Sequence, residues 1–314
     1  MANSIPTETK IPTATFTFVP PENTPTPKQT NTHVPVFKTS YISGQVAYSR
    51  ILSTDEQWII QIFLKNLDTG VVTQLTNSGN SNDLPRWSPD GSKIMYLSWS
   101  KENASDIYLM DKDGKNQQVL IASSADETVP DWSPDGNKIA YVSNKDGDYQ
   151  IYVLDLNTQD TVKLTNNFRS VFSPKWSSDG RQISFISSSS DNKLDARSQV
   201  FIMNADGTNI RQMMEYNLDN FDDRPVWCPD DSCIIFTRHR GPLKLMILNI
   251  SSKSVTTFLD KVFEPEIQEA DIARSPQSDY MTFSAGETFY AMDMKTREIY
   301  PLDVKGAFHL SLYP

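Results

Sequence analysis

The chain has 314 residues, of which 38% are hydrophobic and 11% aromatic, and its formal net charge is -10 at pH 7. This hydrophobic content is enough for a packed core, so the chain as a whole is not disordered, and no run of about 18 apolar residues predicts a transmembrane segment. The acidic balance argues against a nucleic-acid partner, because proteins that bind duplexes usually present a basic surface.

The first 38 residues differ from the rest in composition. They hold seven prolines and nine threonines. Proline-rich segments favour extended, solvated chain, so residues 1–38 are expected to form a disordered leader or spacer, and residues 39–314 the folded domain. No charged segment followed by an apolar one, as in a signal peptide, is present. The segment is either a plain tail or a spacer that tethered the domain to a membrane before its signal or lipidation site was removed.

Three β-type segments follow the leader, at residues 45–49, 60–65 and 71–76. The next four units each open with a Pro-x-Trp motif, followed by Ser-Pro-Asp-Gly or a close variant. The tryptophans of these motifs are Trp87, Trp132, Trp176 and Trp227, spaced 45, 44 and 51 residues apart. A decayed copy has Arg274 in place of the tryptophan. A period in the forties is typical of one blade of a β-propeller.

The remainder of each unit also repeats. In the clearest copy, β-type runs at residues 138–142, 150–154 and 161–165 follow the motif. Proline presets its φ and glycine accepts a left-handed conformation, so Ser-Pro-Asp-Gly predicts a tight hairpin between the first two strands. The strands carry apolar residues on both faces, which indicates sheets covered on both sides by neighbouring sheets.

The pattern Pro-x-Trp-Ser-Pro-Asp-Gly-x-x-Ile-Ala-Tyr at residues 130–141, with Gln-Ile-Tyr-Val-Leu-Asp-Leu at 150–156, resembles the WD-type repeat of the TolB-like propeller family. The resemblance covers about residues 41–314. It is weaker at Cys228, Asp231 and Arg274, which replace the serine, glycine and tryptophan of the motif. The expected fold is all-β: a six-bladed β-propeller of four-stranded antiparallel blades.

Closure of the ring is expected from the last segment of the chain. The first unit has no Pro-x-Trp motif before it, whereas an extended run remains at residues 307–313. We expect this C-terminal strand to join the first blade as its innermost strand, because the pairing would remove two exposed sheet edges.

Cys228 and Cys233 flank the turn at residues 229–232, so they should face each other across a hairpin. Facing residues of antiparallel strands have Cα separations of about 4.5 to 5.5 Å, which is within disulfide range. A bridge would favour an oxidising compartment. The alternative is two independent small residues of the core.

Sequence signatures of catalysis do not occur. The chain lacks Gly-x-Ser-x-Gly, His-Glu-x-x-His and a phosphate-cradling glycine-rich loop. Its histidines, His33, His239 and His309, lie in the leader and in two different units. The Asp-Gly segments at 111–114 and 144–148 lack the other ligands of a calcium loop and are interpreted as turns. We therefore expect no enzyme, no metal and no cofactor.

Function is expected at the mouth of the central channel, in the segments that lead into the innermost strands. The charged candidates there are Asp83, Arg86, Glu127, Asp131, Lys175, Asp222, Asp223, Arg224, Glu269 and Asp271. The alternative is that these loops are polar only because they are exposed to solvent. The functional interpretation is a mostly acidic mouth that binds a partner, and a basic protein is its more specific form.

Two classes of function stay open. The resemblance implies a non-enzymatic, extracytoplasmic binding or scaffold protein, periplasmic or at the cell surface, that engages a protein partner at the mouth. The alternative is a hydrolase or lyase that acts on a carbohydrate or peptide through an acidic pair at the mouth. Two carboxyl groups about 5 to 9 Å apart would support the glycosidase form of that alternative.

Overall fold

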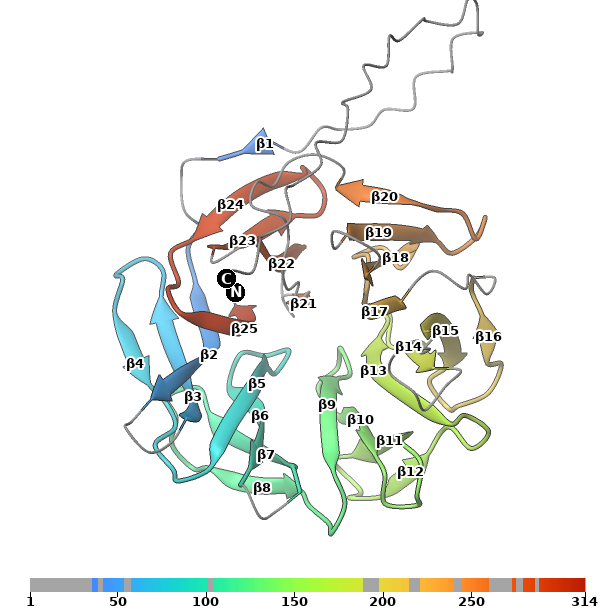
Figure 1. Cartoon of the computed structure of the whole chain (residues 1–314), viewed down its shortest axis with the longest axis horizontal. Coiled ribbons are helices and arrows are strands. Elements are labelled where there is room, and N and C mark those ends of the chain that lie inside the picture. The colour runs from blue at the N-terminus through green and yellow to red at the C-terminus, as the bar shows by residue number, and fades with distance from the viewer. Residues whose placement is uncertain are drawn as a thin grey trace, which may run out of the picture. The chain divides into compact units, whose positions relative to one another are not determined.

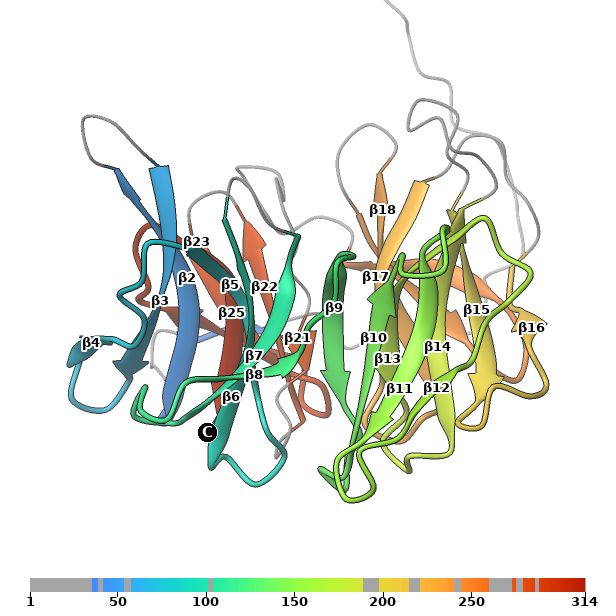
Figure 2. The same cartoon turned by 90° about the horizontal axis from the view of Figure 1, so that it is seen from below.

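Six antiparallel sheets are arranged around a central axis in the computed structural model of the chain (Figure 1). The structure describes residues 36–38, 42–53, 58–100, 104–188, 198–214, 221–239, 244–259, 273–274, 279–285 and 288–313, all within the unit Pro35–Pro314. Seen from the side, the strands run roughly along the axis (Figure 2). The all-β, six-bladed architecture expected from the repeats is confirmed.

The blades are numbered in chain order, and the innermost strand of each is named first. Blade 1 contains β25 (Ala307–Tyr313), β2 (Gln45–Ser53), β3 (Trp58–Asn66) and β4 (Val72–Gln74). Blade 2 contains β5 (Ser81–Trp87), β6 (Lys93–Trp99), β7 (Asp106–Asp111) and β8 (Gln118–Ile121). Blade 3 contains β9 (Glu127–Trp132), β10 (Lys138–Ser143), β11 (Gln150–Asp155) and β12 (Thr161–Lys163).

The other three blades follow the same order. Blade 4 contains β13 (Ser170–Trp176), β14 (Gln182–Ser188), β15 (Ser198–Asn204) and β16 (Arg211–Gln212). Blade 5 contains β17 (Phe221–Trp227), β18 (Cys233–His239), β19 (Lys244–Asn249) and β20 (Val255–Leu259). Blade 6 contains β21 (Ala273–Arg274), β22 (Tyr280–Ala285), β23 (Thr288–Asp293) and β24 (Glu298–Leu302).

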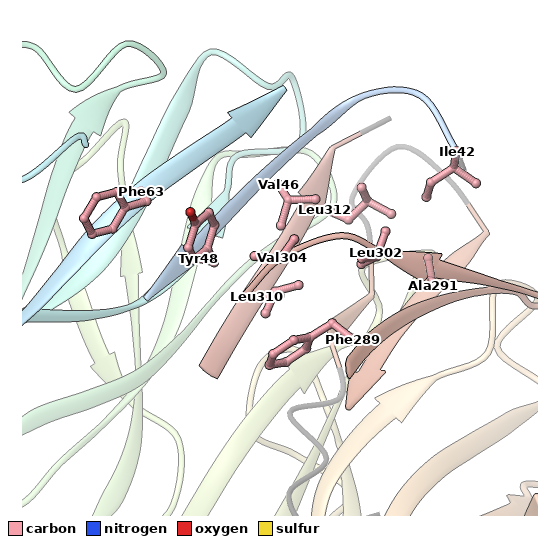
Figure 3. Close-up of a cluster of buried hydrophobic side chains, with 10 residues drawn as sticks. All are labelled: Ile42, Val46, Tyr48, Phe63, Phe289, Ala291, Leu302, Val304, Leu310 and Leu312. Atoms are coloured by element: carbon pink, nitrogen blue, oxygen red, sulfur yellow. The ribbon is translucent and has the colours of Figure 1, made fainter. Parts of the chain in front are cut away.

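The C-terminal strand completes blade 1, as expected. β25 pairs antiparallel with β2, and Val46 lies opposite Leu312. Leu310 and Leu312 are buried in a cluster that spans the joint between blades 6 and 1 and includes Phe289 of blade 6 (Figure 3). The two ends of the folded chain are therefore joined by both backbone pairing and core packing.

A short strand, β1 (Val36–Phe37), lies on the outer edge of blade 6. It pairs parallel with β24, with Val36 opposite Glu298. Lys38 Nζ lies 2.6 Å from a carboxylate oxygen of Glu298. The last residues of the proline-rich segment thus add a fifth strand to this blade.

Buried hydrophobic clusters fill the joints between neighbouring blades. The tryptophan of the motif contributes to them: Trp87 packs with Ala47 and Ile62 of blade 1, and Trp227 packs with Ile202 of blade 4. Each tryptophan therefore faces the preceding blade. Covering both faces of a sheet in this way explains why its strands are apolar on both sides.

The Ser-Pro-Asp-Gly turns are built around the serine hydroxyl. Ser88 Oγ donates to Asp90 at 2.6 Å and accepts the backbone N–H of Lys93 at 3.0 Å. Gly91 has a φ of +67°, and a Cβ at this position would collide with the ring of Tyr313 in the preceding blade. Glycine is therefore required here both by conformation and by packing.

Blade 5 departs from this turn at its first and last positions. Cys228 and Cys233 replace the serine and the lysine, and a disulfide joins them with a Cα separation of 5.2 Å. The covalent bond lies where Ser88 and Lys93 form a hydrogen bond in blade 2.

Asp231 replaces the glycine of the blade 5 turn at a φ of +57°. Its carboxylate accepts the backbone N–H groups of Ser178 at 2.7 Å and Asp179 at 2.9 Å. Both donors belong to the turn of blade 4. The aspartate thus adopts a conformation that usually favours glycine and, in doing so, connects two neighbouring turns.

Candidate functional site

The innermost strands of blades 2 to 5 bend at the residue before the proline. Leu84, Val129, Ser173 and Arg224 have φ values of 52°, 46°, 51° and 53°. The pairing with the second strand shifts register at the same places. A bulge of this kind redirects the side chains that follow it. It determines where the residue between proline and tryptophan points.

These residues meet in a cavity of about 170 Å³, the axial cavity. Its polar and apolar wall comes from five blades: Arg86, Asp131, Lys175, Val226 and Ser311. The four motif tryptophans also line it. An engineered cavity of about 150 Å³ can hold a benzene ring, so the axial cavity has room for one group of side-chain size.

The axial cavity lies at the end of the channel where the innermost strands finish. Pro89 and Pro134, from the turns that follow β5 and β9, form part of its wall. The candidate site predicted from the sequence lies in the segments that lead into these strands, at the opposite end. The position that faces the cavity was visible in the sequence as the variable residue of Pro-x-Trp, but its orientation depends on the bulge.

An ion pair crosses the wall of the axial cavity. Lys175 Nζ lies 2.8 Å from Asp131 Oδ1, and the two side chains are 14% and 19% exposed. The other oxygen of Asp131 accepts the backbone N–H of Trp176 at 2.9 Å. Asp131 therefore connects blade 3 to blade 4 while it lines the cavity.

Ser311 plays the corresponding role between blades 1 and 2. Its hydroxyl accepts the backbone N–H of Trp87 at 3.2 Å, and its carbonyl accepts the indole N–H at 3.1 Å. In blade 5, the indole of Trp227 donates to the carbonyl of Lys175 at 3.0 Å. Arg86 donates to the carbonyl of Leu310 at 3.4 Å. Residues of the cavity wall thus also hold the joints together.

Of the predicted site residues, Arg86, Asp131 and Lys175 meet at the axial cavity. Asp83 and Glu127 lie before the bulge, and both are buried. Asp83 Oδ1 lies 2.8 Å from Nδ1 of His309. Their carboxylates face neighbouring strands and loops of the blades.

The described candidates of blade 5 that precede the bulge are also separate from the axial cavity. Asp222 is buried, and Arg238 donates to its two carboxylate oxygens at 2.6 and 2.9 Å. Asp223 accepts the backbone N–H of Arg224 at 2.7 Å. Glu269 and Asp271 lie outside the described residues. Val226 and Ser311, which are uncharged members of the cavity wall, were not among the predicted residues.

Among the residues that the structure describes, no three histidine, cysteine, aspartate or glutamate side chains converge as a metal site. The same part of the chain contains no helix that is long and apolar enough to cross a membrane.

A family profile described as the TolB beta propeller domain matches residues 39–278. No curated protein matches the chain.

Several solved structures share the fold. TolB from Acinetobacter baumannii is 18% identical, with a TM-score of 0.67 over 86% of this chain and 67% of that chain. The hydrazine synthase of Kuenenia stuttgartiensis is 14% identical, with a TM-score of 0.65 over 86% of this chain and 47% of that chain. An oligogalacturonate lyase in complex with manganese is 16% identical, with a TM-score of 0.55 over 77% of this chain and 69% of that chain. At these identities the likeness concerns the fold alone.

Proposed function

Because the chain belongs to the TolB beta propeller family, we propose that it is a non-enzymatic binding protein that engages a protein partner at the axial cavity, outside the cytoplasm. The observation that carries this proposal is the wall of the cavity. Residues from five blades line it, and the set combines Arg86, Asp131 and Lys175 with the apolar Val226 and with Ser311.

The size of the cavity favours a protein partner over a free small molecule. Pockets that enclose a drug-sized ligand measure about 300 to 1,000 Å³, whereas the axial cavity measures about 170 Å³. A partner could insert one polar side chain or a chain end, and rest the remainder of its surface on the surrounding turns. A single inserted group supported by a wider contact area is a common arrangement at protein interfaces.

The charges favour a polar insert. Asp222 and Glu127, which were predicted to contribute to an acidic mouth, are buried. At the axial cavity, two cationic side chains accompany one carboxylate. Charges that stay partly accessible to solvent steer association and make it sensitive to salt, because screening acts within about 8 Å at physiological ionic strength.

An extracytoplasmic location is part of the proposal. The disulfide between Cys228 and Cys233 supports it, because disulfides persist mainly in oxidising compartments. The tether suggested by the proline-rich leader belongs to the same proposal.

The test uses a variant that fills the axial cavity without changing its charge. A partner is first cross-linked to the full-length protein in envelope extract, identified and purified. Its affinity is then measured for the wild type, for Val226→Phe in the cavity wall and for Val119→Phe on the outer strand of blade 2, where the side chain is 51% exposed. We expect at least about a tenfold loss for Val226→Phe only, equivalent to about 1.4 kcal/mol. Equal affinities for all three proteins would contradict the proposal.

The enzymatic alternative has a separate readout. The purified protein is incubated with oligogalacturonides and with short peptides, and products are separated by chromatography. If the wild type forms products and Asp131→Asn does not, the protein is a hydrolase or lyase and the binding proposal is wrong.

A further inference from the structure

Blades 1 to 4 share a polar position in the first half of their third strands. Glutamine occupies it in blades 1, 3 and 4, as Gln61, Gln150 and Gln199. Gln61 donates to backbone carbonyls of the following loop at 3.1 and 2.8 Å, and Gln150 donates to a carbonyl in the same way at 2.6 Å. In blade 2 the equivalent residue is Asp106, which has no N–H to donate.

A second position, three residues before the proline of the innermost strand, contacts the first across the joint between blades 1 and 2. Between blades 1 and 2, Asn82 occupies it and donates to the side-chain carbonyl of Gln61 at 3.2 Å. Between blades 2 and 3, the equivalent residue is Glu127. A pair of neutral amides at one joint is thus replaced by a pair of carboxyl groups, Asp106 and Glu127, at the next.

Blade 5 shows how the same position is neutralised elsewhere. Asp222 is the equivalent of Glu127, and it pairs in register with Arg238, whose guanidinium binds both carboxylate oxygens. The register partner of Glu127 is Ser143, which supplies a hydroxyl at 3.0 Å and no charge. Among the described residues, the register partner in blade 3 therefore supplies no cation of the kind that blade 5 provides.

Ser123 contacts both carboxyl groups of the pair. Its backbone N–H donates to Asp106, and its hydroxyl donates to Oε1 of Glu127 at 2.6 Å. Oδ1 of Asp106 and Oε2 of Glu127 remain buried without a hydrogen-bond partner among the described residues. Glu127 is only 1% exposed.

The buried, unpartnered carboxylate oxygens of this pair need compensation. An ionised carboxylate in such a place is strongly unfavourable unless it is paired or binds a metal. A bound water could satisfy the two oxygens but could not balance two negative charges.

We propose that the joint between blades 2 and 3 binds a hard divalent cation, calcium, through the carboxylates of Asp106 and Glu127. Calcium takes six to eight oxygen ligands, and the hydroxyl of Ser143, backbone carbonyls and water are of the required type. Two carboxylates are fewer than a high-affinity loop supplies. The expected dissociation constant is therefore about 0.1 to 1 mM, in the range of extracellular calcium modules.

This cation is separate from the axial cavity. Asp106 and Glu127 do not line the cavity, and their joint is stabilised whether or not a partner is bound. The inference therefore goes beyond the proposed function, and its test does not depend on identifying a partner.

The test combines calorimetric titration of calcium with thermal melting of the full-length protein. At about 10 mM calcium, a site of this affinity should raise the melting temperature by a few degrees relative to a chelator, because ligand that binds only the folded state stabilises it. The double variant Asp106→Gln with Glu127→Asn copies the amide pair of the preceding joint. It should fold, melt higher than calcium-free wild type, and lose both the heat of binding and the calcium response.

The control variant is Asp113→Asn, which alters the exposed Asp-Gly turn that resembles part of a calcium loop. It should keep the full calcium response. The proposal is overturned if wild type shows neither heat nor a melting shift with calcium, or if the double variant responds as wild type does. A wild type that ignores calcium but gains stability on mild acidification would instead indicate a shared proton.

Discussion

His309 Nδ1 lies 2.8 Å from Oδ1 of Asp83, although 226 residues separate them in the chain. His309 belongs to the last strand, and Asp83 belongs to the innermost strand of blade 2. The C-terminal strand thus binds forward to blade 2 as well as to its own blade, where Leu310 and Leu312 enter the core.

Removal of residues 307–314 should strongly destabilise the protein. It would expose an edge of β2 and remove two fully buried leucines. The point variant Leu312→Ala should alone lower the free energy of unfolding by about 2 to 5 kcal/mol. Urea denaturation measures both changes. Lys305→Ala, at an exposed position nearby, is the control and should change stability by no more than about 0.5 kcal/mol. A truncated protein that melts like wild type would show that the ring does not depend on this strand.

The bridge between Cys228 and Cys233 is expected in the purified protein. Alkylation without reductant, followed by intact-mass analysis, should label neither cysteine. Replacing both by alanine should cost about 2 kcal/mol in the chain-entropy description of a short loop. The pair Cys228→Ser with Cys233→Lys restores the turn of blade 2 and should recover part of that loss through the serine hydrogen bond. Complete alkylation of unreduced protein would rule the bridge out.

Asp231 should be more stabilising than the glycine it replaces. Asp231→Gly relieves a positive φ but removes two charge-assisted hydrogen bonds to blade 4. Such bonds contribute about 1.5 to 3 kcal/mol each, so we expect a net loss of about 1 to 3 kcal/mol after strain relief. Lys253→Gly is the matched control, because Lys253 has a φ of 55° in an exposed turn. It should be neutral or slightly stabilising. The expectation fails if both glycine variants raise the melting temperature equally.

The turn aspartates predict the response of the protein to acid. The hydroxyl of Ser88 holds the pKa of Asp90 below its usual value, and that of Ser177 acts likewise on the pKa of Asp179. A carboxyl group with a lowered folded pKa stabilises the fold above its unfolded pKa, about 3.9, and this contribution is lost as pH falls through the folded pKa. Part of the loss in melting temperature below about pH 4 should therefore come from these turns.

The acid response is checked by melting curves over a pH series. Asp90→Asn with Asp179→Asn should show a shallower loss below pH 4 than wild type, whereas Asp148→Asn, at an exposed position without such a turn, should behave like wild type. Identical acid profiles for all three proteins would mean that other groups dominate.

The fold was predictable because each blade repeats the same local chemistry. Proline, glycine and tryptophan determine the turn and the joint through short-range geometry, and five copies reinforce one another. The C-terminal closure followed from the same pattern, since the first blade lacked a strand and the last residues supplied one.

The candidate site was only partly predictable. Asp83 and Arg86 are three residues apart in one strand, but the bulge at Leu84 separates a buried carboxylate from a side chain of the cavity wall. A left-handed conformation at a leucine cannot be read from its residue type. Likewise, the charge on Asp222 is balanced by Arg238 of the next strand, a relationship that depends on pairing register.

Asp131 both lines the axial cavity and joins blade 3 to blade 4. Binding in the cavity would therefore be thermodynamically linked to the stability of that joint. The same carboxylate faces the cavity and binds Lys175 and the backbone of Trp176 in the next blade. A bound group that competes with Lys175 for this carboxylate must weaken the joint between blades 3 and 4. A bound group that leaves the ion pair intact adds its own contacts to that joint. By reciprocity, any change that strengthens the joint alters the affinity for the bound group by the same free energy. The stability of the propeller would then control the affinity of the axial cavity, through residues that do not contact the bound group.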